Sequence, residues 1–302
     1  MKKIRIIAIM LLVAMLVPVF TSCKKEKKAE KFQVIDVALR EVVINGPAEK
    51  VVVLSASDCE ILYALGAEKT IIGRGTFCEY PEEAKKITEV KTGSELNIEE
   101  IIALEPDVVI MGKMSNSAEV AQSIQDISGI AVVITNGETL HDIEKSITLI
   151  GKVVGKENEA EVLNKKMEDT FMEIAERVEE PAGKTIYFES SPLEYGLWAA
   201  GEKTYMDQMA NMLGVTNIFN DIEVWGAVSE EQVISRDPDY IISTTDYGNI
   251  SNRAQEIMDR PGWQEMKAVK NGNIYAPDSN ILTIPGPRLV EAMEYLYSII
   301  YE

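Results

Sequence analysis

The stretch NIEEIIALEPDVVIMG at residues 97–112 has a near-copy, SEEQVISRDPDYIISTT, at residues 229–245. Each copy contains a glutamate seven residues before a Pro–Asp pair, and a short apolar run follows the pair. The glutamates are Glu99 and Glu231, and the residues between each glutamate and its pair have a helix-like pattern. A helix–strand unit that occurs once in each half of the chain predicts two halves of related structure.

Seven short apolar runs predict β-strands in these two halves. Their Val- and Ile-rich composition is typical of parallel strands that are covered on both faces. The runs lie at residues 51–55, 70–75, 107–112, 131–136, 185–190, 239–244 and 273–277. Helical stretches alternate with the runs, and 302 residues are too many for one ordinary core. We therefore predict an α/β protein of two lobes, each with a central, mostly parallel sheet flanked by helices.

A single long helix is predicted to join the lobes. Apolar residues recur at steps of three and four, which places them on one face of a helix over residues 157–180. They are Ala160, Leu163, Met167, Phe171, Ile174 and Val178. At ~1.5 Å per residue this helix would span about 36 Å, enough to cross two small lobes. The predicted domains are an N-terminal lobe at 33–140, a joining segment with the helix at 141–182 and a C-terminal lobe at 183–302.

The N-terminus has the pattern of an exported lipoprotein. A basic start, MKKIR, precedes an apolar run at residues 6–20, which is shorter than the roughly 20 residues of a membrane-spanning helix. This length suits an export signal over residues 1–22. The following TSC resembles a lipobox, in which Cys23 is lipidated, although Phe20 replaces the favoured Leu. The alternative is a plain secretory signal. Residues 23–32 are too polar to pack and are predicted to be a charged tether.

Charge and cysteine content narrow the partners and leave one question open. The chain has a formal net charge of −19, and removing the three basic residues of the signal leaves −22. This charge argues against nucleic acid and suits docking onto a basic surface. Cys59 follows the first predicted strand and Cys78 follows the second. Because disulfides persist outside the cytoplasm, the two residues are predicted to form either a disulfide or two free thiols.

The sequence favours neither a metal centre nor a cofactor. Its one histidine, His141, is predicted to lie on the surface near a helix start, whereas most transition-metal receptor sites use several histidines. No phosphate loop, nucleophile elbow or dinucleotide fingerprint is present. We therefore predict no catalytic residue, bound metal or cofactor. An enzyme would instead need a cleft carboxylate with a strongly raised pKa.

Four segments together resemble the substrate-binding lipoproteins of ABC importers for iron(III) siderophores, haem and cobalamin. These segments lie at residues 51–81, 96–112, 228–243 and 260–296, in the family's order and spacing. The resemblance implies two lobes bridged by one long helix, with the ligand bound in the cleft between them. It also implies an exported receptor that delivers a small-molecule metal chelate to an ABC permease dimer and its ATPase.

The resemblance gives the two glutamates a role. In this family one acidic residue per lobe pairs with arginines of the permease, and those positions match Glu99 and Glu231. A two-fold permease offers two equivalent basic pockets, so a pseudo-symmetric receptor should present two equivalent acids. The alternative is that both residues only favour the dipoles of the helices in which they lie.

The ligand cleft is expected at the carboxyl ends of the strands. Five aromatic candidates fall in loops near these ends, namely Phe77, Tyr195, Trp198, Trp225 and Tyr247; Phe77 and Trp225 match cleft positions of the family. Ser94 stands where some relatives have an aromatic residue, which would widen that wall. Only Arg74 and Lys113 add positive charge, because Arg288 is expected to fix the turn into the last helix.

Two cations are too few for a polyanionic tricatecholate siderophore, so a less charged chelate is expected. An iron(III) complex, either a siderophore or haem, is preferred because such receptors are the commoner members of the family, and cobalamin is the alternative. A second alternative is a surface lipoprotein for adhesion or sensing, which would need no ligand cleft. The protein is expected to be a monomer that contacts the membrane only through its lipid anchor. Its place is the outer face of the cytoplasmic membrane or the periplasm.

Overall fold

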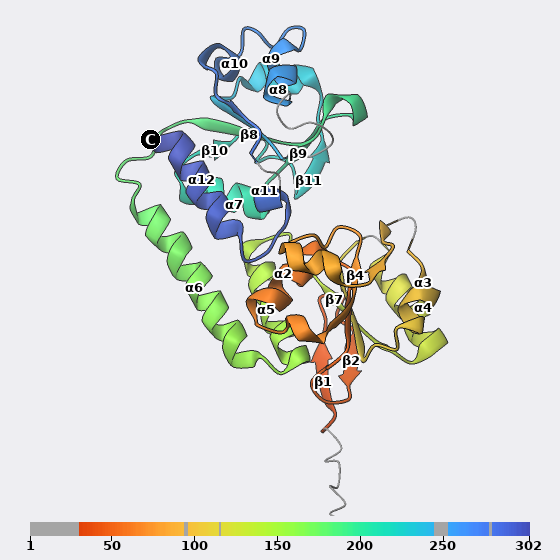
Figure 1. Ribbon diagram of the computed structural model, residues 1–302. Helices are drawn as coiled ribbons and strands as arrows, with labels where there is room; N and C mark the ends of the chain where they lie inside the picture. The colour runs from red at the N-terminus through yellow and green to blue at the C-terminus, as the bar shows by residue number, and fades with distance from the viewer. Residues whose placement is uncertain (1–29, 94–95, 115, 245–252, 278–279) are drawn as a thin grey trace, which may run out of the picture. The chain divides into compact units, whose positions relative to one another are not determined.

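The computed structural model describes residues 30–93, 96–114, 116–244, 253–277 and 280–302. Residues 31–302 form one unit (Figure 1). It opens with an antiparallel hairpin of β1 (Phe32–Ile35) and β2 (Glu41–Ile44), which the sequence did not predict. Within the described residues, no helix combines the length and the apolarity that crossing a bilayer requires.

The first lobe contains a parallel sheet with the strand order β5-β4-β3-β6-β7. Its strands are β3 (Val51–Val53), β4 (Ile71–Gly75), β5 (Glu89–Val90), β6 (Val108–Gly112) and β7 (Ala131–Thr135). Its helices are α2 (Ala56–Ala64), α3 (Ile98–Ala103), α4 (Ser117–Ser128) and α5 (Leu140–Val154). Val51 and Val53 pack in the cluster that includes α2 and α5, whereas Val52 packs in the cluster of α3 and α4. Helices thus cover both faces, as the continuous apolar runs predicted.

The second lobe contains a mixed sheet with the order β11-β9-β8-β12-β13, and β10 also pairs with β8. Its strands are β8 (Thr185–Ser191), β9 (Trp198–Ala200), β10 (Thr216–Asn217), β11 (Trp225–Ala227), β12 (Tyr240–Ser243) and β13 (Ile274–Tyr275). Its helices are α7 (Tyr205–Met212), α8 (Glu230–Arg236), α9 (Arg253–Asp259), α10 (Lys267–Asn271), α11 (Asn280–Thr283) and α12 (Leu289–Tyr301). Only β9 and β11 run antiparallel to their neighbours. The predicted fold class, two α/β lobes with mostly parallel sheets, is confirmed.

Helix α6 (Glu157–Glu176) is the predicted long helix, and it runs beside both lobes in Figure 1. It packs against α5 of the first lobe and α12 of the second. It ends four residues before the predicted end at residue 180. Pro181 disfavours helical geometry in the residue before it, so the helix could not have continued past this point. At ~1.5 Å per residue, the 20 residues span about 30 Å.

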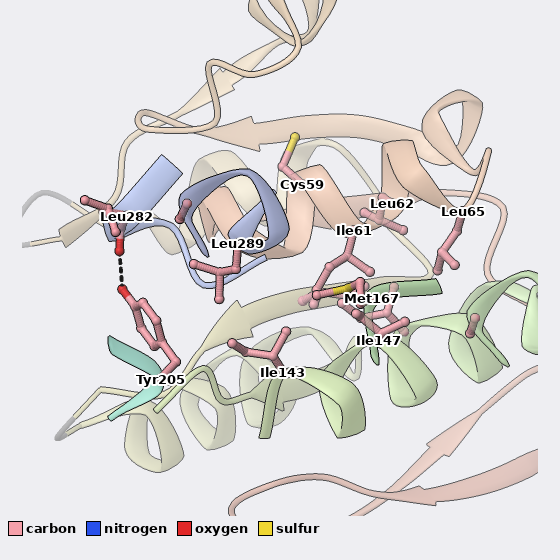
Figure 2. Packing of buried hydrophobic residues seen from close by; sticks show 14 of the residues in the cluster. Cys59, Ile61, Leu62, Leu65, Ile143, Ile147, Met167, Tyr205, Leu282 and Leu289 are labelled. Atoms are coloured by element: carbon pink, nitrogen blue, oxygen red, sulfur yellow. Dashed lines mark hydrogen bonds between the residues drawn. The ribbon is translucent and has the colours of Figure 1, made fainter. Parts of the chain in front are cut away.

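One hydrophobic cluster continues from the first lobe through α6 into the second lobe (Figure 2). It includes Leu62 of α2, Ile147 of α5, Met167 of α6 and Leu289 of α12. Figure 2 also shows Tyr205, whose hydroxyl donates a hydrogen bond of 2.7 Å to the backbone oxygen of Leu282. The lobes therefore share a packed core, which restricts hinge motion between them.

The repeated stretch folds into the same helix in both lobes. Asn97 caps α3 and Ser229 caps α8, each by accepting backbone N–H groups of the first turn. The residue before each proline, Glu105 or Asp237, has a positive φ of 50° or 45° and follows the end of the helix. The two copies thus share a side-chain cap at their start and the backbone conformation that follows their end.

The Pro–Asp pairs connect neighbouring strands. A carboxylate oxygen of Asp107 accepts a 2.8 Å hydrogen bond from the backbone N–H of Lys50, just before β3. Asp239 likewise accepts a 2.9 Å bond from the backbone N–H of Thr185, the first residue of β8. Each aspartate therefore fixes the start of one central strand to the start of the next, which is a scaffold role.

Candidate ligand cleft and docking carboxylates

A cleft of about 950 Å³ lies between the lobes. It is lined by the loops that leave the carboxyl ends of β3, β6, β7 and β12, together with parts of the second sheet and residues 283–285. This is where ligands of α/β proteins usually bind. The surface is mostly apolar with interspersed hydroxyl and amide groups, a composition typical of sites for large small-molecule ligands.

Four predicted cleft residues line this cleft. They are Phe77, Lys113, Trp198 and Trp225. Phe77 is 70% exposed and Trp198 is 44% exposed, so both present apolar surface at its walls. The ring of Trp225 meets the ring of Tyr205 edge-on, with 6.3 Å between their centroids. The aromatic walls therefore come from both lobes.

Arg74 and Tyr195 do not line the cleft, contrary to the prediction. Arg74 is 7% exposed, and its guanidinium donates to the backbone oxygens of Gly75 and Thr76 and to the carboxylate of Glu89. Its positive charge is therefore paired inside the first lobe. Tyr195 lies in a short 3₁₀ helix, Leu193–Tyr195, and is exposed outside the lining. The predicted residues Ser94 and Tyr247, and the lipidation candidate Cys23, lie outside the described residues.

The charged groups of the described lining are one lysine and one glutamate. Lys113 follows β6, and Glu138 follows β7. The ammonium of Lys113 lies 3.4 Å from a carboxylate oxygen of Glu138, so the two charges offset each other. Glu138 was not predicted from the sequence, because the loop that follows the strand at residues 131–136 was not included among the loops expected to line the cleft. The rule that ligands meet the carboxyl ends of strands would have included it.

A buried carboxyl lies beside the cleft but does not line it. Asp58 is 1% exposed, and the hydroxyl of Thr135 donates to it at 2.9 Å. Burial raises the pKa of Asp58 to about 7, while hydrogen bonds from Thr135 and Ser55 oppose that rise. A side chain that no ligand reaches cannot exchange protons with a substrate, so this carboxyl is not an acid–base candidate.

Glu99 and Glu231 occupy equivalent places. Each is the second residue of its helix, α3 or α8, and each is exposed. Neither has an ion-pair partner among the described residues, whereas the neighbouring Glu100 accepts from Asn97 and Glu230 accepts from the indole N–H of Trp263. A hydrogen bond from its own backbone N–H, and a smaller contribution from the side chain of Ser229, lower the pKa of Glu231. Both carboxylates are thus exposed and available to an external cation.

Cys59 and Cys78 are both buried, and both are free thiols in this structure. Hydrogen bonding with Cys59, together with burial, raises the pKa of the Cys78 thiol, and the Cys78 Sγ lies 3.8 Å from the backbone oxygen of Val53. Of the two alternatives left open by the sequence, the structure therefore has the free thiols rather than the disulfide.

His141 lies on the surface in the first turn of α5, and its Nδ1 is 3.2 Å from the carboxylate of Glu144. Among the described residues, no group of three or more His, Cys, Asp and Glu side chains is placed to hold a metal ion. The described lining of the cleft offers a ligand apolar contact and hydrogen-bonding groups.

Two α/β lobes, a helix that bridges them and a ligand-sized cleft at the strand ends define a bilobal solute-binding protein. The chain belongs to the periplasmic binding protein family, whose model matches residues 51–281. It is 31% identical over 285 residues, covering 92% of this chain and 88% of the relative, to the uncharacterized ABC transporter substrate-binding lipoprotein YvrC of Bacillus subtilis. The protein is therefore a substrate-binding protein of an ABC transporter and works with an ABC permease.

Two further comparisons concern relatives named for a ligand. The vitamin B12-binding protein of Pectobacterium atrosepticum is 26% identical over 262 residues, covering 84% of this chain and 89% of the relative. A solved structure from Staphylococcus epidermidis, described as a possible iron-binding periplasmic solute-binding protein, is 28% identical with a TM-score of 0.74. That comparison covers 84% of this chain and 99% of the solved chain.

Proposed function

We propose that the protein captures a large metal chelate of low net charge in the interlobe cleft, first of all cobalamin, and delivers it to an ABC permease. The observation that carries this proposal is the charge of the cleft. Its described lining contains one cation, Lys113, and that cation is paired with Glu138 at 3.4 Å. A polyanionic ligand would lose its hydration there without gaining a compensating set of cations.

The side chains of the described lining that could ligate a metal also help to distinguish haem from cobalamin. Haem iron is held by a histidine, cysteine, methionine or tyrosine side chain. The described lining contains neither histidine nor cysteine, so that only methionines and one tyrosine remain. Its one tyrosine, Tyr205, is 2% exposed and already donates its hydroxyl to Leu282. Cobalamin brings its own metal ligands and a rim of amides, which suit a mostly apolar cleft with hydroxyl and amide groups. The similarity to the vitamin B12-binding protein supports the same choice.

The iron(III) complex preferred from the sequence becomes the second candidate. An uncharged ferric hydroxamate siderophore meets the charge criterion as well as cobalamin does. The similarity to the Staphylococcus epidermidis protein supports this candidate. An adhesion or sensing role is less well supported, because such a protein needs no open cleft of about 950 Å³. An enzyme is also less well supported, because Asp58, whose pKa is strongly raised, is buried outside the lining.

The remaining parts of the proposal concern delivery. We propose that the chain is exported, that Cys23 carries the lipid anchor and that Glu99 and Glu231 contact the permease. The exposure and equivalent helix positions of the two glutamates support the docking role. The lipoprotein name of the Bacillus subtilis relative supports the anchor. The monomeric state predicted from the sequence is part of the same proposal.

Isothermal titration of the purified full-length protein with cyanocobalamin, ferrichrome, haemin and ferric enterobactin tests the ligand class. We expect saturable one-to-one binding of cyanocobalamin, weaker or no binding of uncharged ferrichrome and no binding of polyanionic ferric enterobactin. Tight binding of haemin or ferric enterobactin, without binding of either uncharged chelate, would overturn the proposal.

A further inference from the structure

The charged pair of the cleft comes from two adjacent parallel strands. Gly112 of β6 is in register with Thr135 of β7, and the backbone N–H of Lys113 donates to the oxygen of Thr135 at 2.8 Å. Lys113 and Glu138 therefore leave the same edge of the sheet and reach the same wall of the cleft. Their side chains are 47% and 38% exposed, so both charges face the space that a ligand would fill.

The backbone contacts of Glu138 link it to both lobes. Its backbone oxygen accepts a 2.8 Å hydrogen bond from the backbone N–H of Tyr205, the first residue of α7 in the second lobe. Its second carboxylate oxygen accepts from the side-chain amide of Asn136 at 3.4 Å. Glu138 is therefore held where the lobes meet, whereas Lys113 reaches it through a flexible four-carbon side chain.

An anionic ligand that approaches Lys113 also meets the negative charge of Glu138, because the two groups are in contact. The repulsion offsets the attraction, and the buried part of the ligand loses its water as well. An uncharged chelate with amide or hydroxamate oxygens avoids this conflict, since it can accept a hydrogen bond from Lys113 while the ion pair stays intact. Specificity of this kind depends on a repulsive group as much as on an attractive one.

We propose that Glu138 determines the charge selectivity of the cleft, by neutralising Lys113 and so excluding anionic chelates in favour of uncharged ones. This inference rests on the proposed function and names the residue that restricts its substrate class. Replacing Glu138 by Gln keeps the shape and the contact with Asn136 but frees the charge of Lys113. The same site would then accept an anion.

The test compares the full-length wild type, Glu138→Gln and the double variant Glu138→Gln with Lys113→Met. Isothermal titration with ferric enterobactin, ferrichrome and cyanocobalamin gives the ratio of anionic to uncharged binding. We expect Glu138→Gln to raise the affinity for ferric enterobactin about fivefold or more, as the release of a partly exposed ion pair allows. We expect the double variant to lose this gain, so that the ratio of anionic to uncharged binding rises in Glu138→Gln alone.

Glu144→Gln is the matched control, since it removes the same charge from a surface position outside the cleft. An equal gain in Glu144→Gln, or no gain in Glu138→Gln, would overturn the inference, and so would wild-type protein that binds ferric enterobactin as tightly as the uncharged chelates. Thermal melting confirms that each variant is folded. The proposed function is tested separately, because it fails if the wild-type protein binds neither uncharged chelate. In that case the effect of Glu138→Gln on the affinity for ferric enterobactin still tests the role of Glu138.

Discussion

At the scale of the single residue, Asp58 is a buried acid with no cationic partner among the described residues. Burial raises its pKa from 3.8 to about 7, so the native state keeps a proton that the unfolded chain releases. Between about pH 4 and pH 7 the native state therefore binds more protons, and its free energy of unfolding falls as the pH rises. Above about pH 7 both states have released this proton, so the titration of Asp58 no longer changes the free energy of unfolding.

Asp58→Asn should remove this pH dependence, because an amide cannot ionise and can still contact Thr135. The quantity to compare is the unfolding free energy of the variant minus that of wild type. We expect this difference to be about 2–4 kcal/mol larger at pH 8 than at pH 4. Urea unfolding at the two pH values measures the difference. The exposed Asp126→Asn is the control and should show no such change. A wild-type slope preserved in Asp58→Asn would show that another group titrates.

Two exposed aromatics, three residues apart in the chain, provide a matched pair. Trp198 lines the cleft and Tyr195 does not. Trp198→Ala should weaken binding of the ligand about tenfold, because a large aromatic contact is lost, whereas Tyr195→Ala should change it less than about twofold. Isothermal titration with the chelate that binds wild type measures both. If Tyr195→Ala weakened binding as much as Trp198→Ala, the position of the cleft wall would be wrong.

At the scale of the element, the seven strands with continuous Val and Ile runs were predictable, since their pattern reflects burial on both faces. The hairpin β1–β2 and the two- and three-residue strands β5, β9, β10 and β11 were not, because tertiary pairing rather than local pattern defines such short pieces. The same limit applies to the cleft. The sequence places Arg74 at a strand end, but it does not show that Glu89 and two backbone oxygens bind its guanidinium.

The repeated helix–strand unit has a testable stabilising contact in each lobe. Asp239 accepts from the backbone N–H of Thr185 at 2.9 Å and from its hydroxyl at 3.0 Å. Asp239→Ala would leave these donors without their acceptor at the start of β8. We expect the unfolding free energy to fall by about 1–3 kcal/mol in urea unfolding.

The exposed Asp259→Ala is the control for this variant, and it should stay within about 0.5 kcal/mol of wild type. A loss in Asp239→Ala no larger than that of the control would mean that water replaces the side chain at this strand end. The structural reason for the second Pro–Asp pair would then be wrong.

At the scale of the whole molecule, contacts between residues far apart in the chain join the lobes. Arg288 was expected only to fix the turn into α12, but its Nε and Nη2 contact the carboxylate of Glu60 in α2 at 3.0 and 2.5 Å. Its guanidinium also lies 3.8 Å from the ring centroid of Tyr80. These partners are more than 200 residues away in the sequence, and no local pattern predicts such a pairing.

Breaking this ion pair on one side should destabilise the protein more than replacing both partners. Arg288→Met leaves Glu60 buried and unpaired, and burial already raises the pKa of Glu60. We expect a loss of about 3 kcal/mol at pH 7, of which the double variant Glu60→Gln with Arg288→Met regains a part. Urea unfolding of the two single variants and the double variant measures the coupling. Strictly additive losses would show that the pair does not act across the lobes.

The two copies of the glutamate-containing unit lead to a prediction that only the assembled transporter can test. Glu99→Ala with Glu231→Ala removes one exposed carboxylate from each lobe and leaves the cleft unchanged. We expect chelate binding to stay at the wild-type level while uptake into cells falls about tenfold or more, because rim charges govern association with a charged partner. Glu161→Ala with Glu168→Ala removes the same charge from α6 and should leave uptake unchanged. If uptake survived the first pair of changes or fell equally in the second, the glutamates would serve their helix dipoles and not the permease.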